Sequence, residues 1–430
     1  MFQFFFYWQI ERRGRRDGPE RGFALIHGPR LYDGWVSYRF SARTGWDVGE
    51  SGFAAAIREA RAAGRRLVDL TVSNPTVCGF EYDAAAILAP LGDASALIYD
   101  PDPRGMRSAR EAVAGYYGGH GASVDPDAVV LTTSTSEGYA YLFRLLCDAG
   151  DEVLVAQPSY PLFDFLADLE DVGLRTYPLF YDDGWWIDFA ELERRIGPRT
   201  KAIVVVHPNN PTGHATGAAE RERLQEICLQ RGLALIVDEV FLDYPLGEVG
   251  LRSFAVGPHP VLTFCLSGMS KIAGLPQMKV GWIVGLGPEG VRREAMGRLE
   301  VIADTFLSMN APVQIALPNW LAGRKGIQEQ ILARVRGNLA AARSIGAGCG
   351  VEVLRVEAGW SAILRLPQMG GDRDVAERLL RDAGVVVHPG SFYGIAESGR
   401  VVVSLLGVEQ EFAEGLERIV HGQKLNHDSY

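Results

Sequence analysis

Short apolar runs that alternate with segments of helical character constrain the fold of this chain more than any other feature. The runs lie at 129–133, 152–156, 202–206 and 234–237, an extended segment lies at 174–179, and helical segments occupy 136–147, 161–171, 188–196 and 218–231. Strands made almost entirely of Val, Ile, Leu and Ala must be covered on both faces, as in parallel sheets. The alternation therefore predicts an α/β fold built on a mostly parallel, doubly wound sheet.

The pattern changes on both sides of this region. From about residue 289 to residue 347 the sequence is helical, and we expect breaks near Pro312 and Pro318 because proline interrupts helical hydrogen bonding. We then expect strands at 351–356, 360–366, 385–388 and 400–406, a helix at 373–383 and a final helix at 409–420. We predict a large domain of residues 96–287 and a smaller α+β domain formed by 288–430 with a contribution from 39–95. Segment 1–38 has no periodic pattern, and we expect a disordered extension or sequence upstream of the true start.

Composition excludes several classes of protein. The 430-residue chain has a formal net charge of −10, which argues against a nucleic-acid surface. Its five cysteines are scattered without zinc or disulfide spacing, which favours a reducing cytoplasm. No apolar run reaches the length of about eighteen residues that a membrane span needs. We therefore expect a cytoplasmic protein that binds no metal, nucleic acid or membrane.

Polar segments follow the predicted strands, at the edge where doubly wound sheets bind ligands. The run Ser134-Thr135-Ser136 opens a helix, where hydroxyl and N–H groups favour a phosphate, although these residues could equally be a plain helix cap. Tyr160 could cover a flat ring or could simply pack. Asn210, held between prolines in the segment 207–213, suits a hydrogen bond to a ring hydroxyl, or the segment is only a turn.

Two charged residues complete this set. Asp238 ends an apolar strand and needs a partner such as a protonated pyridine nitrogen, or else a structural salt bridge. Lys271 lies between the apolar runs 261–265 and 280–285, and we expect it in a loop between two strands. Burial there would lower its pKa and make it a nucleophile toward carbonyls, whereas alone it would be a solvated charge. Together the five segments predict pyridoxal phosphate as cofactor.

Over about residues 40–420 the chain resembles the fold-type I pyridoxal-phosphate-dependent enzymes, specifically the class I/II aminotransferase family. The resemblance rests on the order of short motifs: Asn74-Pro75, Tyr99 to Gly105, Ser134-Thr135-Ser136, Pro158 to Tyr160, Asn210-Pro211-Thr212-Gly213, Asp238-Glu239, Ser270-Lys271 and Pro389-Gly390. Each motif is weak alone, and the series is strong.

The resemblance implies a role for each motif residue. Lys271 would form the Schiff base and shuttle a proton, Asp238 would keep the pyridine nitrogen protonated, Asn210 would bond the ring hydroxyl, and Tyr160 would stack on the ring. Tyr99 would reach the phosphate in the neighbouring subunit, which implies a homodimer. The remaining phosphate contacts would be Ser134, Thr135, Ser136, Ser270 and Lys279, and the candidate substrate contacts are Asn74, Trp360 and Arg400.

Three positions depart from the family pattern. Phe241 replaces a tyrosine that bonds the ring hydroxyl, a loss that Tyr244 could offset. Lys279 replaces an arginine on the phosphate, which keeps the charge and loses the bidentate fork. Val402 occupies the position of the arginine that usually binds the substrate carboxylate. Arg400 could substitute from the same strand face or could be a solvated strand end; otherwise the substrate is held differently or lacks a carboxylate.

These observations predict a transaminase (EC 2.6.1 type) that moves an amino group between an amino acid and a 2-oxo acid. The alternative is another reaction of the same cofactor, either β-elimination by a C–S lyase or transfer from an amine that lacks the carboxylate contact. Trp360 would face an apolar substrate group or would belong to the core. A cofactor-binding sensor attached to a DNA-binding module is disfavoured, because the first 38 residues are too short for a winged helix.

Overall fold

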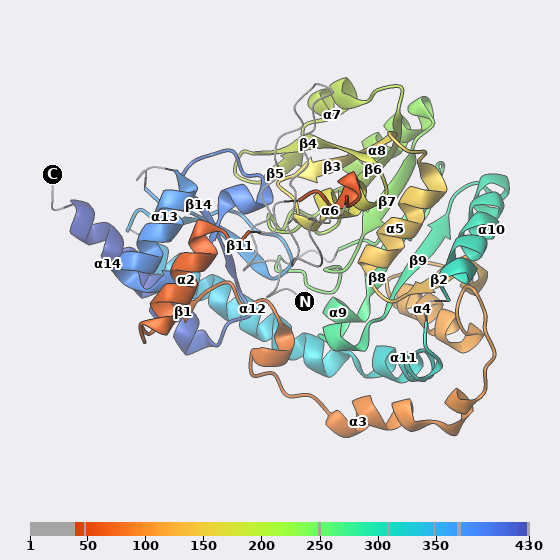
Figure 1. Ribbon diagram of the computed structural model, residues 1–430, viewed down its shortest axis with the longest axis horizontal. Helices are drawn as coiled ribbons and strands as arrows, with labels where there is room; N and C mark the ends of the chain where they lie inside the picture. Colours follow the sequence, from red (N-terminus) through yellow and green to blue (C-terminus); the bar gives the residue numbers. More distant parts are fainter. Residues whose placement is uncertain are drawn as a thin grey trace, which may run out of the picture.

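A large sheet of eight strands forms the centre of the molecule (Figure 1). The computed structural model describes residues 39–427 except 47–48, 248–250, 308, 348 and 368–370. The strand order is β2-β9-β8-β7-β6-β3-β4-β5, in which β8, β7, β6, β3 and β4 are mutually parallel and β9 and β5 run antiparallel to their neighbours. The bounds are β2 Val129–Thr132, β3 Glu152–Gln157, β4 Gly173–Tyr181, β5 Trp185–Ile187, β6 Thr200–Val206, β7 Ala234–Asp238, β8 Thr263–Gly268 and β9 Gly281–Leu286. The predicted fold class is confirmed.

Helices cover both faces of this sheet, because successive residues of its strands enter two separate apolar cores. Ile203 and Val205 of β6 pack in one core, and Ala202 and Val204 pack in the other. The helices that connect the strands are α4 Arg107–Gly119, α5 Thr135–Leu146, α6 Leu162–Leu169, α7 Phe189–Arg195, α8 Ala218–Arg231 and α9 Met269–Ile272. The predicted helices 136–147, 161–171, 188–196 and 218–231 lie within two residues of these bounds.

A smaller antiparallel sheet lies beside the large one, with the order β10-β11-β14-β13. Its strands are β10 Glu352–Val353, β11 Ser361–Arg365, β14 Arg400–Ser404 and β13 His388–Pro389. A separate parallel pair joins β1 Val68–Asp69 to β12 Val385–Val386. The helices around these strands are α2 Gly52–Ala62, α13 Asp372–Arg378 and α14 Glu409–His427 (Figure 1). This pairing supports the predicted share of segment 39–95 in the small domain, although the domain limits stay a prediction and segment 1–38 lies outside the described residues.

The long helical region consists of α10 Glu289–Phe306, α11 Ala311–Gly323 and α12 Lys325–Gly346. The break near Pro312 is confirmed, since this proline lies at the start of α11. The break at Pro318 is wrong, because Pro318 lies inside α11 and the next boundary falls at Arg324. Buried Leu317, Trp320 and Leu321 hold α11 in place, so packing outweighs one missing helical hydrogen bond.

Other predicted bounds also changed. The strand expected at 351–356 is reduced to the two residues of β10, and the final helix extends beyond the expected residue 420 to His427. Short strands at the edge of a small sheet have little apolar pattern of their own. Their limits therefore depend on cross-strand partners that the sequence does not reveal.

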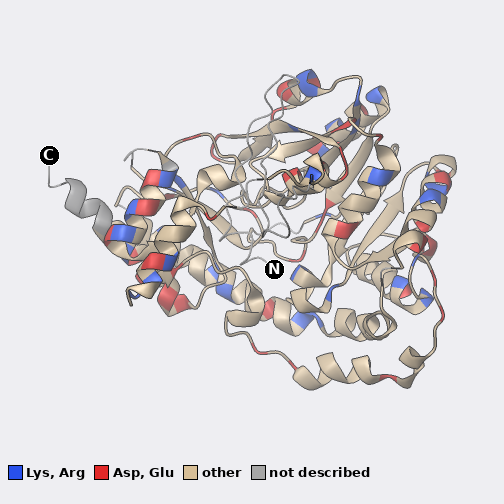
Figure 2. Cartoon of the chain, viewed as in Figure 1, with Lys and Arg blue, Asp and Glu red and all other residues tan. Residues whose placement is uncertain are grey.

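Residues 84–99, which lie between β1 and α4 in the sequence, form a segment that we call the arm. Helix α3 Ala84–Leu88 and the short turns after it run along the lower edge of Figure 1, where they pack on α11. The arm exposes four apolar side chains: Leu88, Leu97, Ile98 and Tyr99. Elsewhere the outer helices alternate acidic and basic residues (Figure 2), and these pair along the helix, as in Arg298–Glu294 of α10. Among the described helices, none is both long and apolar enough to cross a bilayer.

Candidate active site

Lys271 lies on α9, a single helical turn that begins directly after β8. The expectation of a plain loop is wrong, because one turn is too short to show helical periodicity in sequence. The side chain is 6% exposed, and its Nζ lies 5.0 Å from the centre of the Trp360 ring and 5.6 Å from that of Phe241. Burial lowers the pKa of Lys271 to about 7, although the charge of Asp238 opposes this shift. A substantial fraction of the amine is therefore uncharged, and nucleophilic, at neutral pH.

Asp238 is the last residue of β7, the strand next to β8. Its carboxylate is buried and accepts two hydrogen bonds, from the Tyr139 hydroxyl to Oδ2 at 3.1 Å and from the Val240 N–H to Oδ1 at 3.1 Å. Burial raises the pKa of Asp238 to about 6, while both hydrogen bonds and the charge of Lys271 oppose the rise. The structure thus brings a buried acid and a buried amine into electrostatic contact at the carboxyl edge of the sheet.

The N-terminus of α5 lies against the same edge. Ser134 caps the helix, because its Oγ accepts the N–H of Glu137 at 3.1 Å. The N–H groups of Thr135 and Ser136 belong to the first turn, which has no intrahelical acceptors, and the helix dipole adds positive potential there. A Cβ on Gly281 of β9 would lie 2.9 Å from the backbone carbon of Ser134, so a side chain there would displace this turn. Ser134 can therefore cap α5 while the N–H groups of Thr135 and Ser136 bind an anion, so the two interpretations of this segment do not exclude each other.

Asn210 is oriented by a residue from the small sheet. The Ser361 hydroxyl of β11 donates to Asn210 Oδ1 at 3.2 Å, which leaves the Nδ2 group of Asn210 as a donor. Tyr160 follows β3 and is partly buried, and burial raises its pKa. The loop that carries Tyr160 is fixed by a bond from the Ser159 N–H to the carbonyl of Tyr393 at 3.0 Å. Both predicted ring contacts therefore lie where the two sheets meet.

The other predicted contacts differ in their settings. Lys279 has a φ of 53° and an exposed side chain, and a lysine in this left-handed conformation is a strained position of the kind found at functional sites. Ser270 lies on α9 beside Lys271. Asn74 caps a short turn by accepting the Thr76 N–H, and Tyr99 is 82% exposed on the arm.

Val402 and Arg400 face the side of the small sheet that Asn210 contacts. Ser361 and Ser404 are directly paired across β11 and β14, and paired residues share a sheet face. Val402 and Arg400 lie two and four residues before Ser404, hence on that face as well. Arg400 is partly buried at the start of β14, and burial together with the nearby Arg365 charge lowers its pKa.

The immediate surroundings of Val402 are uncharged. Its cross-strand partners are Ile363 of β11 and His388 of β13. His388 is buried, and this lowers its pKa to about 3, so its ring is neutral at physiological pH. Trp360, which directly precedes β11, is 2% exposed and covers Lys271 together with Phe241. The direct cross-strand neighbours of Val402 on this face therefore offer a substrate carboxylate no counter-charge, and Arg400 is the charged residue that shares the face.

Two side chains near the site differ from expectation. The Tyr244 hydroxyl donates to the backbone carbonyl of Lys271 at 2.6 Å, so Tyr244 supports α9 and does not offset Phe241. Tyr139 was not expected at the site at all. Its position four residues after Thr135, on the same face of one helix, was the only signal in the sequence that could have indicated it.

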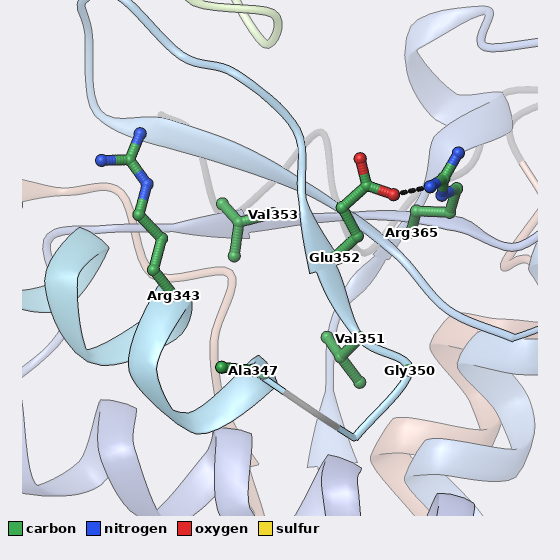
Figure 3. A pocket seen from close by; sticks show the side chains of 8 residues that line it. Arg343, Ala347, Gly350, Val351, Glu352, Val353 and Arg365 are labelled. Atoms are coloured by element: carbon green, nitrogen blue, oxygen red, sulfur yellow. Dashed lines mark ion pairs between the residues drawn. The ribbon is translucent and has the colours of Figure 1, made fainter. Parts of the chain in front are cut away.

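A hollow of about 440 Å³ lies outside this site (Figure 3). It is open to solvent, and Figure 3 shows Arg343 of α12 on one side and the ion pair of Arg365 with Glu352 on the other. Its lining consists of Arg343, Gly346, Ala347, Gly350, Val351, Glu352, Val353 and Arg365, which include no predicted site residue.

The fold and the site define a class of protein, the fold-type I pyridoxal-phosphate-dependent enzymes. The described residues fit this cofactor, because a buried amine of lowered pKa, a buried carboxylate and a helix N-terminus whose first N–H groups lack intrahelical acceptors match its aldehyde, ring nitrogen and phosphate. The family model for aminotransferases of class I and II matches residues 68–419. The chain belongs to this family of pyridoxal-phosphate-dependent transaminases.

Individual relatives agree with this assignment. The chain is 31% identical over 274 residues to the glutamate-pyruvate aminotransferase AlaA of Haemophilus influenzae, and 30% identical over 277 residues to the alanine aminotransferase of Mycobacterium tuberculosis. Each match covers 63% of this chain, and they cover 67% and 64%, about two thirds, of the respective relatives. The structure of the alanine aminotransferase from Pyrococcus furiosus superposes with a TM-score of 0.82 at 22% identity, over 90% of this chain and 100% of that chain.

Proposed function

We propose that this protein moves an amino group between an amino acid and a 2-oxo acid, with Lys271 as the catalytic residue. The observation that carries the proposal is the pairing of the buried Lys271 amine with the buried Asp238 carboxylate at the ends of adjacent strands. When bound, pyridoxal phosphate supplies an electron sink for breaking a bond at the substrate Cα.

The chain's own residues divide the remaining work. The Lys271 amine would hold the cofactor by its aldehyde, and the same amine, when free, would accept the proton from the substrate Cα. Asp238 provides the anionic partner of the ring nitrogen, and Asn210 donates from Nδ2 to the ring hydroxyl. Tyr160 stacks on the ring. The phosphate is held by the α5 N-terminus and by cationic and hydroxyl groups, namely Ser134, Thr135, Ser136, Ser270 and Lys279.

The relatives suggest which substrates to test first. Two of them are named as alanine and glutamate-pyruvate aminotransferases, so L-alanine and L-glutamate are the first amino donors, with pyruvate and 2-oxoglutarate as acceptors. Asn74, Trp360 and Arg400 remain the candidate substrate contacts. Trp360 is the most strongly supported of them, because its ring lies against the Lys271 amine.

A second candidate function is transfer from a primary amine that has no α-carboxylate. It is favoured by one observation, the uncharged group of Val402, Ile363 and His388 on the sheet face that contacts Asn210. An apolar surface gives a carboxylate no counter-charge, whereas it accepts an alkyl or aryl group readily.

We further propose that the protein is a cytoplasmic homodimer in which Tyr99 of one subunit reaches the phosphate of the other. The support is the exposed apolar run on the arm, where Leu97 is 90% exposed and Ile98 is 67% exposed. Contiguous apolar surface of this kind marks interaction sites in soluble proteins.

The test uses the purified protein loaded with pyridoxal phosphate. L-alanine with 2-oxoglutarate, L-glutamate with pyruvate, and 1-phenylethylamine with pyruvate are compared by measuring the new amino acid formed. Amino-acid exchange supports the first proposal, and exchange with the amine alone supports the second. A fourth arm with S-ethyl-L-cysteine, which has a thiolate leaving group on Cβ, tests the lyase: release of ethanethiol, ammonia and pyruvate without exchange would show an eliminating lyase. Lys271→Ala should abolish turnover, while Lys201→Ala, which removes a partly exposed lysine paired with Asp151, should not.

A further inference from the structure

We propose that Tyr139 is a positioning residue that fixes the Asp238 carboxylate toward the ring nitrogen of the cofactor. The proposal rests on the proposed function and adds a residue to it. The hydroxyl of Tyr139 donates to Asp238 Oδ2 at 3.1 Å, and Tyr139 is 3% exposed. Because the Val240 N–H occupies Oδ1, each carboxylate oxygen is held by one neutral donor. The carboxylate plane is thereby set, and the charge is left unneutralised for a cationic ligand.

The Tyr139 hydroxyl itself is held rigidly. Its ring packs edge-on against Phe163 of α6, with ring centres 5.0 Å apart and planes at 88°. It also lies 6.0 Å from the ring of Phe143, one turn further along α5. Two aromatic neighbours from two helices leave the ring little freedom, so the hydroxyl is placed before any ligand arrives.

The position of Tyr139 links two parts of the site. Thr135 and Tyr139 are four residues apart, so they share one face of α5 and are separated by about 6 Å along the helix axis. The first of them lies at the N-terminus that the cofactor phosphate would meet, and the second contacts the acid that the ring nitrogen would meet. One rigid helix therefore determines the spacing between the phosphate site and the acid.

In the pair of Tyr139 and Asp238, the tyrosine hydroxyl is the donor and the carboxylate is the acceptor. Burial and the nearby Asp238 charge raise the pKa of Tyr139 well above its ordinary value, so the hydroxyl stays protonated and can only donate. Toward an ionised carboxylate the hydroxyl acts as the donor, and this donation is among the effects that keep the pKa of Asp238 from rising further. Without it, Asp238 takes up a proton more readily and loses the charge that attracts a protonated ring nitrogen.

The experiment compares Tyr139→Phe with Tyr177→Phe in the full-length protein. Tyr177 is a matched control, because it is similarly buried and donates its one hydrogen bond of 3.0 Å to the carbonyl of Val204 and not to Asp238. For each protein we would measure the Kd of the apoprotein for pyridoxal phosphate, the pH midpoint of the bound cofactor's absorbance change, kcat and KM for L-alanine, and the thermal unfolding temperature.

Tyr139→Phe should weaken cofactor binding and lower kcat, each by about tenfold, the scale of one lost hydrogen bond to a charged group. The KM should change less than about twofold, because the contact does not touch the substrate. The pH midpoint should shift upward, since a less positive ring raises the pKa of the nitrogen that Lys271 contributes. Tyr177→Phe should lower the unfolding temperature without shifting the midpoint.

The inference is overturned if Tyr139→Phe matches Tyr177→Phe in cofactor affinity, pH midpoint and kcat. Equal losses of thermal stability with an unchanged midpoint would show that Tyr139 serves packing alone. A wild-type protein that fails to bind pyridoxal phosphate would instead contradict the proposed function, so the two failures are distinguishable.

Discussion

At the scale of single residues, the site depends on burial that changes the charge of two side chains in opposite directions. Burial lowers the pKa of Lys271 to about 7 and raises that of Asp238 to about 6. Each group on its own would favour losing its charge, and each partly restores the charge of the other. This balance keeps an uncharged amine available close to a carboxylate at neutral pH.

The pH dependence of cofactor capture follows from the Lys271 value. Only the uncharged amine attacks an aldehyde, so the rate constant for covalent capture of pyridoxal phosphate should rise with pH and level off above about pH 7. A solvent-exposed lysine would give a rate that rises until about pH 10.4. Stopped-flow absorbance of the apoprotein over this pH range measures the midpoint, and a rate still rising tenfold per pH unit at pH 9 would contradict the assignment.

The sequence predicted some of these residues and missed others for a physical reason. Asp238 and Lys271 each follow an apolar strand, and the carboxyl ends of parallel strands share one edge, so their proximity follows from the strand pattern. Tyr139 and Ser361 are instead placed by packing. The Tyr139–Asp238 bond joins residues 99 apart, and the Ser361–Asn210 bond joins residues 151 apart. Apart from the four-residue spacing between Thr135 and Tyr139, no local sequence pattern indicates either contact.

At the scale of elements, the approach of β9 to the start of α5 determines the phosphate site. A Cβ on Gly281 would lie 2.9 Å from the backbone carbon of Ser134 and 3.1 Å from the N atom of Thr135. These atoms belong to the backbone, so they cannot move aside as a flexible side chain could. The N-terminus of α5 can therefore lie this close to β9 only because Gly281 has no side chain.

Gly281→Ala should displace the first turn of α5. We expect it to reduce the free energy of unfolding by about 1–3 kcal/mol, the range for overpacking, and to weaken the binding of pyridoxal phosphate. Gly290→Ala is the control, because a Cβ there meets no atom within 4 Å in α10 and alanine favours a helix. Urea unfolding and cofactor titration measure both effects, and equal behaviour of the two variants would contradict the coupling.

The bounds of helices and strands agree with the sequence prediction where the apolar pattern is long. They disagree where tertiary packing determines whether a helix or strand forms. Except for β5, which no apolar run predicted, the strands of the large sheet lie close to their expected limits, and so do helices α5 to α8. The sequence predicts a loop where the single turn of α9 forms, because Gly268, Gly274 and Pro276 surround Lys271 with turn-forming residues. The helix through Pro318 formed because three large apolar side chains of α11 are buried on one side of it.

At the scale of the whole molecule, the arm that contains Tyr99 has no partner within the described chain for its exposed apolar side chains. Leu97 and Ile98 precede Tyr99 directly, and all three are more than half exposed. A second subunit would cover them and complete the phosphate contact at once. Subunit association and cofactor binding should therefore be linked.

Leu97→Glu should raise the dimer dissociation constant by at least about tenfold, because a buried unpaired charge is costly in an interface. Sedimentation velocity with and without pyridoxal phosphate measures the change. Leu229→Glu is the control, since Leu229 is 62% exposed on α8 and lies outside the arm. Wild-type protein that sediments as a monomer at all concentrations, or a Leu97→Glu variant that dimerises like wild type, would contradict the proposed assembly.

The pairing of β1 with β12 has a consequence for how the protein is made on the ribosome. Val68 precedes every strand of the large sheet in the sequence, and its partner Val385 follows all of them. All strands of the large sheet lie between β1 and β12 in the sequence, so the large sheet can assemble before β1 has its partner strand. The β1–β12 pair therefore cannot form until residues 385–386 have been synthesised, and a chain truncated before them would leave β1 without its strand partner.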